Sequence, residues 1–219
     1  MHLAEPTTPG PWPGVVVVHE ALGLTDDIRA KADRFAARGY LAAAPDLFGE
    51  GNVLKCVLGA FRQLNTGKGV AFDTLEAARA ELAAHPQCTG KVGIIGFCMG
   101  GGFALLCGAK YDFAAAAPNY GQLPRKPDRT LAGSCPVVAS YGKKDLTLYG
   151  AAKKLDRVLT ANGVEHDVKE YPKASHSFMS RYEGKTAVLA RVAGLRHRPD
   201  DAEDAWRRID AFFDEHVQG

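Results

Sequence analysis

Three side chains of this chain could together attack a carbonyl group: Cys98, Asp145 and His176. A thiol, an imidazole and a carboxylate can act as nucleophile, general base and the group that orients the base. Cys98 is the middle residue of the sequence G-F-C-M-G at residues 96–100. Glycines around a turn residue indicate a tight, strained backbone, because a β-carbon there would collide with the neighbouring strand or helix. The pattern therefore predicts a thiol held up at a turn for nucleophilic catalysis.

Alternating strands and helices must position these residues. The predicted strands are residues 15–18, 40–44, 92–95, 113–117, 136–141 and 165–171. The predicted helices run from the N-cap Thr25 to Gly39, and over residues 53–64, 73–85, 148–162 and 202–217, the last after a polar segment at 191–201. One more helix is expected to open after the Cys98 turn and to continue over residues 103–108. We expect residues 1–14 to be an exposed leading segment with a short edge strand near Leu3. The alternation is typical of a parallel sheet with helices on both faces.

The order of the three candidates favours catalysis over simpler interpretations. G-x-C-x-G can hold a structural cysteine, Asp145 can be an ordinary turn aspartate, and His176 can be an ordinary loop histidine. Each residue, however, follows a predicted strand, where a parallel sheet presents its ligand sites. The order nucleophile, acid, histidine is the one found in α/β-hydrolases. Cys98, Asp145 and His176 are therefore the predicted triad.

Two backbone N–H groups are predicted to stabilise the charge that develops on the carbonyl oxygen. Met99 directly follows the predicted nucleophile, and Ala21 lies in the loop after the strand at 15–18. Donors at such positions are worth about 3 kcal/mol each in the transition state. Ala21 and Met99 are therefore the predicted oxyanion hole.

Composition limits the class of protein. The chain has 219 residues, of which 46% are hydrophobic, enough for one substantial core and a single domain over 1–219. A net charge of +2, without long runs of like charge, gives no case for nucleic acid or a membrane surface as partner. No apolar stretch approaches the roughly 20 residues that cross a bilayer. We expect a cytoplasmic protein, a monomer or small homo-oligomer, that acts on small molecules.

The cysteines argue against a disulfide framework and against a metal site. Their number is odd, and no C-x-x-C pair or zinc-ligand spacing occurs among them. They are Cys56, Cys88, Cys98, Cys107 and Cys135. We expect reduced thiols and no metal.

Five motifs of the chain resemble the dienelactone hydrolase family, within the α/β-hydrolases. The motifs are H-E-A-L-G-L at 19–24, A-P-D-L at 44–47, G-K-V-G-I-I-G-F-C-M-G-G at 90–101, Y-G-K-K-D at 141–145 and S-H-S-F at 175–178. The resemblance covers most of the chain and implies an α/β-hydrolase fold with a shortened N-terminus. It also implies hydrolysis of an ester or enol-lactone by a Cys-His-Asp triad, without a metal or organic cofactor.

The resemblance gives Glu20 a role in regulating the thiol. In the family, the glutamate at this position holds the resting thiol until a substrate carboxylate displaces it. A carboxylate beside Cys98 would disfavour a second negative charge and so keep the thiol neutral. The simpler interpretation is that Glu20 caps the helix that follows it.

The chain departs from the family where arginines grip the substrate carboxylate. One family arginine lies four residues after the catalytic histidine, and here that position is Ser180, with Arg181 next to it. We predict Arg181, Arg62 and Tyr120 as substrate-binding residues. The alternative for the two arginines is that they are solvated surface residues.

These patterns together predict a cysteine hydrolase for a small, anionic lactone or carboxylic ester. Thioester hydrolysis or acyl transfer would use the same side chains. A non-catalytic α/β-hydrolase-like protein that binds a small molecule is the alternative from another class, and a redox-sensing role for Cys98 is a third.

Overall fold

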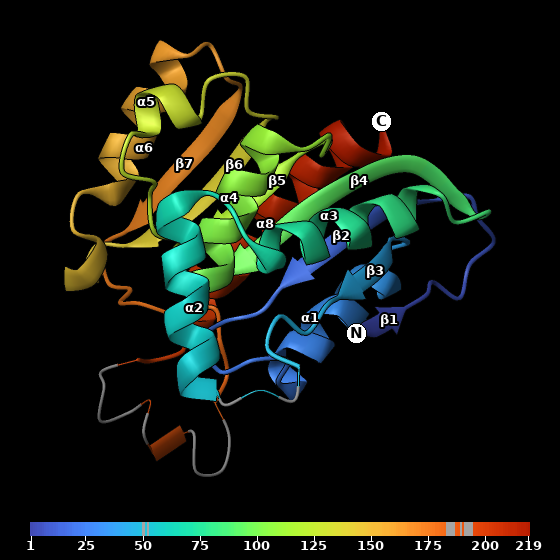
Figure 1. Ribbon diagram of the computed structural model, residues 1–219, viewed down its shortest axis with the longest axis horizontal. Helices are drawn as coiled ribbons and strands as arrows, with labels where there is room; N and C mark the ends of the chain where they lie inside the picture. Colours follow the sequence, from blue (N-terminus) through green and yellow to red (C-terminus); the bar gives the residue numbers. More distant parts are fainter. Residues whose placement is uncertain (50, 52, 183–186, 189, 191–194) are drawn as a thin grey trace.

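The computed structural model describes residues 1–49, 51, 53–182, 187–188, 190 and 195–219. A seven-stranded sheet forms its centre, in the order β1-β3-β2-β4-β5-β6-β7 (Figure 1). The strands are β1 (His2–Ala4), β2 (Trp12–Val18), β3 (Leu41–Ala44), β4 (Cys88–Phe97), β5 (Ala116–Asn119), β6 (Val137–Gly142) and β7 (His166–Tyr171). β1 pairs with β3 antiparallel, and the other neighbouring strands of the sheet pair parallel. The predicted parallel α/β architecture is therefore confirmed.

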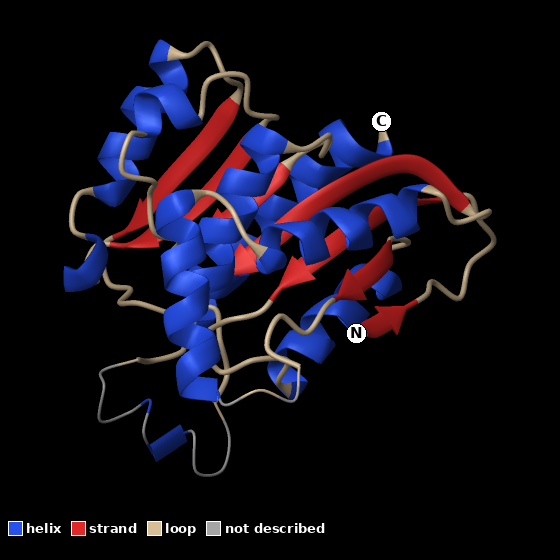
Figure 2. Cartoon of the chain, viewed as in Figure 1, coloured by secondary structure: helices blue, strands red, loops and turns tan. Residues whose placement is uncertain are grey.

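Helices cover both faces of the sheet (Figure 2). They are α1 (Asp26–Ala37), α2 (Val53–Thr66), α3 (Val70–Ala83), α4 (Met99–Lys110), α5 (Pro127–Thr130), α6 (Ala151–Ala161) and α8 (Pro199–Phe213), with a 3-10 turn η1 (Leu146–Leu148) and a π-helical turn η2 (Asp214–Gln218). Val15 and Val17 share a core with α1 and α8, whereas Val16 and Val18 share the opposite core with α3 and α4. Successive strand residues point to opposite faces, so the valine run of β2 serves both cores.

Two elements begin three residues later than predicted. β4 and α3 begin earlier than predicted, at Cys88 instead of residue 92 and at Val70 instead of residue 73. The strand predicted at 113–117 is β5, which starts at Ala116 and continues to Asn119. Asn119 can extend a buried strand because its side-chain amide donates to the carbonyls of Gly96 and Ala117. The helix predicted at 148–162 begins only at Ala151, since Gly150 before it takes a left-handed conformation with φ of 73°.

The leading segment is less exposed than its prolines and threonines suggest. Trp12, Pro13 and Gly14 are buried within β2, which corrects the expectation of an exposed segment up to residue 14. The edge strand expected near Leu3 is confirmed as β1. Thr25 stands at the N-cap of α1 as predicted, but its side chain makes no capping hydrogen bond.

The end of the chain forms the predicted helix in two parts, α8 and η2. α8 begins at Pro199, inside the polar segment predicted at 191–201, of which residues 191–194 lie outside the described residues. Within the described part of the chain, every helix is too short or too polar to cross a lipid bilayer.

Candidate active site

Cys98 lies at a strained turn between β4 and α4. Its φ of 55° and ψ of −117° are uncommon for a residue with a side chain. A β-carbon at Gly96 would lie 2.0 Å from the carbonyl oxygen of Gly100, and one at Gly100 would lie 2.4 Å from that of Val18. Only glycine fits these two positions, which explains the G-x-C-x-G pattern. The turn leaves Cys98 half-buried at the carboxyl edge of the sheet.

Asp145 and His176 meet at the same edge, after β6 and β7. The Nδ1 atom of His176 lies 2.5 Å from Oδ2 of Asp145. The other carboxylate oxygen accepts hydrogen bonds from the backbone N–H of Thr147 at 3.0 Å and from its hydroxyl at 2.6 Å. Burial alone would raise the pKa of Asp145, but the hydrogen bonds from His176 and Thr147 lower it below its usual value. Asp145 is thus held as a carboxylate that fixes the imidazole.

The ring of His176 also interacts with the thiol of Cys98. Burial lowers the pKa of this histidine, but the hydrogen bonds to Asp145 and Cys98, together with their charges, raise it to about 10. Since Nδ1 faces Asp145, Nε2 is the nitrogen left for Cys98. The three residues predicted from separate loops therefore lie together, and the site stabilises the imidazolium that forms when His176 accepts the thiol proton.

The predicted oxyanion donors flank this turn. Met99 is the first residue of α4, and the first N–H groups of a helix have no acceptor within it. Ala21 follows β2 in a turn closed by the hydrogen bond from Gly23 N–H to the carbonyl of Glu20. The contribution of both N–H groups to catalysis stays a prediction.

His19 orients the loop that carries Glu20 and Ala21, a role that the sequence patterns do not predict. It is fully buried, and its Nε2 accepts the backbone N–H of Leu47 at 3.0 Å. Nδ1 therefore carries the hydrogen and donates to the carbonyl of Glu20, 2.6 Å away. Burial lowers the pKa of His19, which favours this neutral form. The buried histidine thus links two of the motifs, H-E-A-L-G-L and A-P-D-L.

Glu20 is held by two hydroxyl groups. Ser180 donates to Oε1, and Tyr182 donates to Oε2 at 3.0 Å. Tyr120 lies 3.0 Å from the Ser180 oxygen and must be the donor, because the single hydroxyl hydrogen of Ser180 is used on Glu20. No sequence signal pointed to Ser180 or Tyr182 as partners of Glu20. The predicted hold of Glu20 on the resting thiol stays a prediction.

Comparison with known proteins decides the family. The model of the dienelactone hydrolase family matches residues 1–217. This chain belongs to the dienelactone hydrolase family. The ester hydrolase activity predicted from the motifs is thereby confirmed at the level of the enzyme class.

Two curated relatives cover nearly the whole chain. A carboxymethylenebutenolidase of Rhodococcus opacus is 26% identical over 219 residues, which are 93% of this chain and 81% of the relative. Protein usf of Aquifex pyrophilus is 29% identical over 233 residues, 99% of this chain and 93% of the relative. Among solved structures, a dienelactone hydrolase-like promiscuous phosphotriesterase from metagenomic libraries has a TM-score of 0.76 and 24% identity, and covers 95% of this chain and 88% of that protein. The structural likeness supports the α/β-hydrolase fold.

The three predicted substrate-binding residues of this dienelactone hydrolase family member lie in different surroundings. Tyr120 is fully buried, takes a φ of 40°, and packs its ring edge-on against His176, with the ring centres 5.3 Å apart. Arg62 is exposed on α2. Arg181 is also exposed and lines a cavity. Direct contact of these residues with substrate stays a prediction.

The cavity beside Glu20 has a volume of about 400 Å³. Its lining residues are Glu20, Leu22, Thr25, Asp26, Asp27, Ala30, Arg181 and Tyr182. Asp27 is paired with Lys31 of the next helical turn. Carboxylates thus outnumber cations in a cavity that Glu20 and Tyr182 border.

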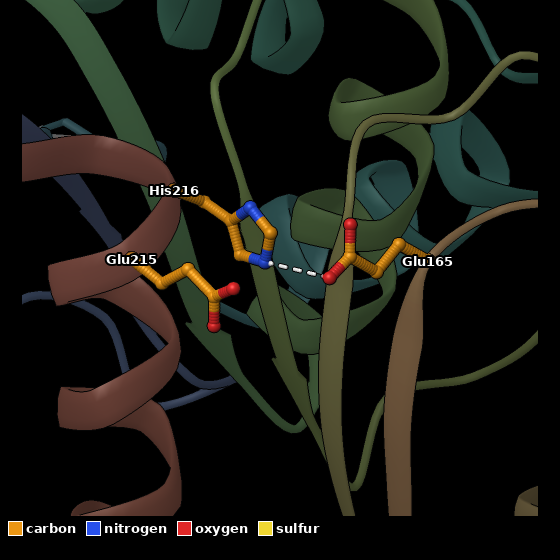
Figure 3. A group of neighbouring side chains, drawn as sticks. All are labelled: Glu165, Glu215 and His216. Atoms are coloured by element: carbon orange, nitrogen blue, oxygen red, sulfur yellow. Dashed lines mark ion pairs between the residues drawn. The ribbon is translucent and has the colours of Figure 1, made fainter. Parts of the chain in front are cut away.

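One group among the described residues has the atoms of a metal site, but it lies away from the triad. Glu165, Glu215 and His216 place one ligand atom each within 4.8 Å of one another. Figure 3 shows the His216 ring directed toward Glu165, with Nε2 3.4 Å from a carboxylate oxygen. Glu165 immediately precedes β7, whereas the triad residues follow their strands. The group is therefore at the opposite edge of the sheet and takes no part in the chemistry at Cys98.

Proposed function

We propose that the protein hydrolyses small lactones or carboxylic esters through Cys98, His176 and Asp145, with an acyl-enzyme on Cys98. One observation carries the proposal: a cysteine in a left-handed turn contacts a histidine whose other nitrogen is 2.5 Å from a buried aspartate. Nucleophile, base and orienting group are therefore adjacent in the order that acyl transfer requires.

The first half of the reaction forms the acyl-enzyme. His176 Nε2 accepts the Cys98 proton while the sulfur attacks the carbonyl carbon, and the carbonyl oxygen becomes an oxyanion near the N–H groups of Ala21 and Met99. Collapse of this intermediate breaks the bond to the alcohol oxygen, which takes the proton from His176. The product is a thioester on Cys98. In a lactone, the released alcohol stays attached to the acyl group.

The second half regenerates the thiol. His176 takes a proton from water, and the hydroxide formed attacks the thioester carbonyl. The intermediate expels the thiolate of Cys98, which recovers the proton from the imidazolium, and the carboxylic acid leaves. Asp145 stabilises the imidazolium in both halves, consistent with the raised pKa of His176.

The sulfur nucleophile favours esters and lactones over amides. A thiolate is a better leaving group than an amine, so an intermediate formed from an amide would expel the thiolate and return to substrate. We also propose that the Glu20 carboxylate disfavours a thiolate in the resting enzyme, which would protect Cys98 from oxidation.

A substrate panel tests the proposal. Aryl esters and unsaturated lactones are assayed with the wild type, Cys98→Ala and His176→Ala, and turnover is expected with the wild type and lost in both variants. Lys143→Ala, at an exposed position before Asp145, serves as the control that should keep activity. Turnover that persists in Cys98→Ala would refute the mechanism, and absence of turnover on every substrate would favour a binding protein.

A further inference from the structure

Glu20 and Cys98 lie on neighbouring strands at matching positions. β2 and β4 are adjacent and parallel, and Val18 is in register with Gly96. Glu20 follows Val18 and Cys98 follows Gly96 at the same spacing along the chain. Adjacent strands are about 5 Å apart. The Glu20 carboxylate is therefore one of the nearest charges to the carbonyl under attack. Tyr182 donates to Glu20, and burial and the charge of Glu20 raise its pKa, to which a thiolate at Cys98 would add.

The partners of Glu20 leave its charge in place. Both of its oxygens accept hydrogen bonds, from Ser180 and Tyr182, as the ionised form requires. Within the part of the chain that the structure describes, no lysine or arginine pairs with this buried carboxylate. The hydroxyls hold the carboxylate in position but add no positive charge.

The cavity next to Glu20 is also lined by more carboxylates than cations. Asp26 and Asp27 line it together with Glu20, and Asp27 has its own cation in Lys31. Leu22 adds an exposed apolar surface. Arg181 is the cation of the lining, but it is exposed to solvent, which screens its charge far more than a buried one. Among the described residues that line this cavity, a substrate carboxylate would meet Glu20 without a buried counter-ion.

We infer that Glu20 selects substrates by charge, so that the site takes neutral lactones or esters and disfavours those with a carboxylate near the scissile bond. The inference rests on the proposed function and narrows its substrate class. It reverses the anionic substrate expected from the sequence. Ser180 and Tyr182 are positioning residues for this selection, since they fix the carboxylate that faces the substrate.

Matched lactones test the selection by turnover. An unsaturated lactone with a carboxymethylene group and the same lactone as its primary amide differ in charge but hardly in shape. The wild type is expected to show the higher kcat/KM for the amide, and Glu20→Gln is expected to raise the anionic-to-neutral ratio about tenfold or more, because a unit charge a few Å away is removed. Asp26→Asn, which removes an exposed charge from the same cavity, is the control and should change the ratio less than about twofold.

Alkylation of Cys98 gives a second measurement that needs no turnover. Iodoacetate and iodoacetamide perform the same displacement on the thiolate and differ in charge. Peptide mass spectrometry separates Cys98 from the other thiols. Relative to glutathione, wild-type Cys98 should disfavour iodoacetate by about tenfold, and Glu20→Gln should remove this difference. A change in thiolate population affects both reagents equally, so the ratio reports the local charge.

The outcomes separate the two proposals. If both lactones are turned over only when Cys98 is present, and the anionic one is preferred, the selection is refuted while the proposed function stands. A loss of that preference in Arg181→Gln would then assign the specificity to Arg181. If neither lactone is turned over, the alkylation ratio still decides: a ratio equal to that of glutathione, or in favour of iodoacetate, would overturn the role of Glu20.

Discussion

Two buried carboxylates follow strands at the edge of the sheet that carries Cys98, and they differ in their partners. Asp145, on the β6 side, is 4% exposed, and Glu20, on the β2 side, is 6% exposed. Asp145 contacts the imidazole of His176, which can take up a proton and become its counter-ion. Glu20 contacts the hydroxyls of Ser180 and Tyr182, which remain neutral. The two sides are equally shielded from water, so their partners decide what each carboxylate does.

We propose that the edge of the sheet both activates the thiol, through Asp145 and His176, and restrains it, through Glu20. A carboxylate that orients an imidazole stabilises the charge pair formed during attack. A carboxylate held by neutral donors keeps its own field, which opposes negative charge on Cys98 and on the substrate. Removal of the two carboxylates should therefore have opposite effects on the chemistry of the thiol.

The largest expected effect is on turnover. Asp145→Asn should lower kcat by roughly 10⁴-fold, because an amide can fix the imidazole in the wrong tautomer. Steady-state assays on the best ester of the panel measure this loss. Glu20→Gln should cost much less on a neutral ester. If the two variants lost activity to the same extent, the proposal that the two carboxylates differ in function would be wrong.

The Asp145–His176 pair should also give a pH-dependent stability. In the folded protein burial lowers the pKa of His176, but the hydrogen bonds and charges of Asp145 and Cys98 raise it to about 10. The stability contributed by the protonated imidazole is therefore fully present below about pH 6.5, the ordinary pKa, and is lost as pH rises through about 10. The difference in unfolding free energy between the wild type and His176→Gln should shrink over that interval. Urea unfolding at several pH values measures it. A difference that is constant from pH 6 to pH 10 would contradict the pairing.

Glu20→Gln should make the thiol more reactive. Without the carboxylate beside Cys98, the thiolate forms more easily, so alkylation by iodoacetamide at pH 7 should accelerate about tenfold and its pH profile should move to lower pH. Asp145→Asn should slow the same reaction, because the imidazolium is less stable. An unchanged pH profile of alkylation in Glu20→Gln would show that Glu20 does not restrain the thiol of Cys98.

The smallest expected effect is on stability at the Glu20 side. Ser180→Ala removes one of the two donors of a buried carboxylate and should cost about 1–3 kcal/mol of unfolding free energy. Thr66→Ala, which removes an exposed hydroxyl bonded to its own helix, should change stability by less than about 0.5 kcal/mol. Chemical denaturation compares the two. Equal values would mean that Ser180 contributes little to holding Glu20.

The sequence predicted the parts of this site that local patterns encode. The valines of β2 and the glycines around Cys98 are required by burial and by close backbone approach, so both can be recognised within a few residues. Asp145 and His176 were predictable because the carboxyl ends of parallel strands converge. Sequence patterns predicted the start of a helix less reliably where one residue turns the backbone, as Gly150 does before α6.

The partners of Glu20 could not be predicted, because its contacts join distant parts of the chain. Glu20 meets Ser180 and Tyr182 across some 160 positions, and serine or tyrosine in a loop carries no signal for such a partner. His19 was likewise visible as part of a motif, but its role depends on the contact with Leu47, in the loop after β3. The triad side follows from topology, whereas the restraining side depends on tertiary packing.

The central claim is that Cys98 carries the acyl group during ester hydrolysis. Acid quenching of the enzyme during turnover of an activated aryl ester, followed by peptide mass spectrometry, tests it directly. We predict an added acyl mass on the peptide that contains Cys98 in the wild type, and no such mass on that peptide in Cys98→Ala. Acylation of a different residue, or turnover that continues without acylated Cys98, would contradict it.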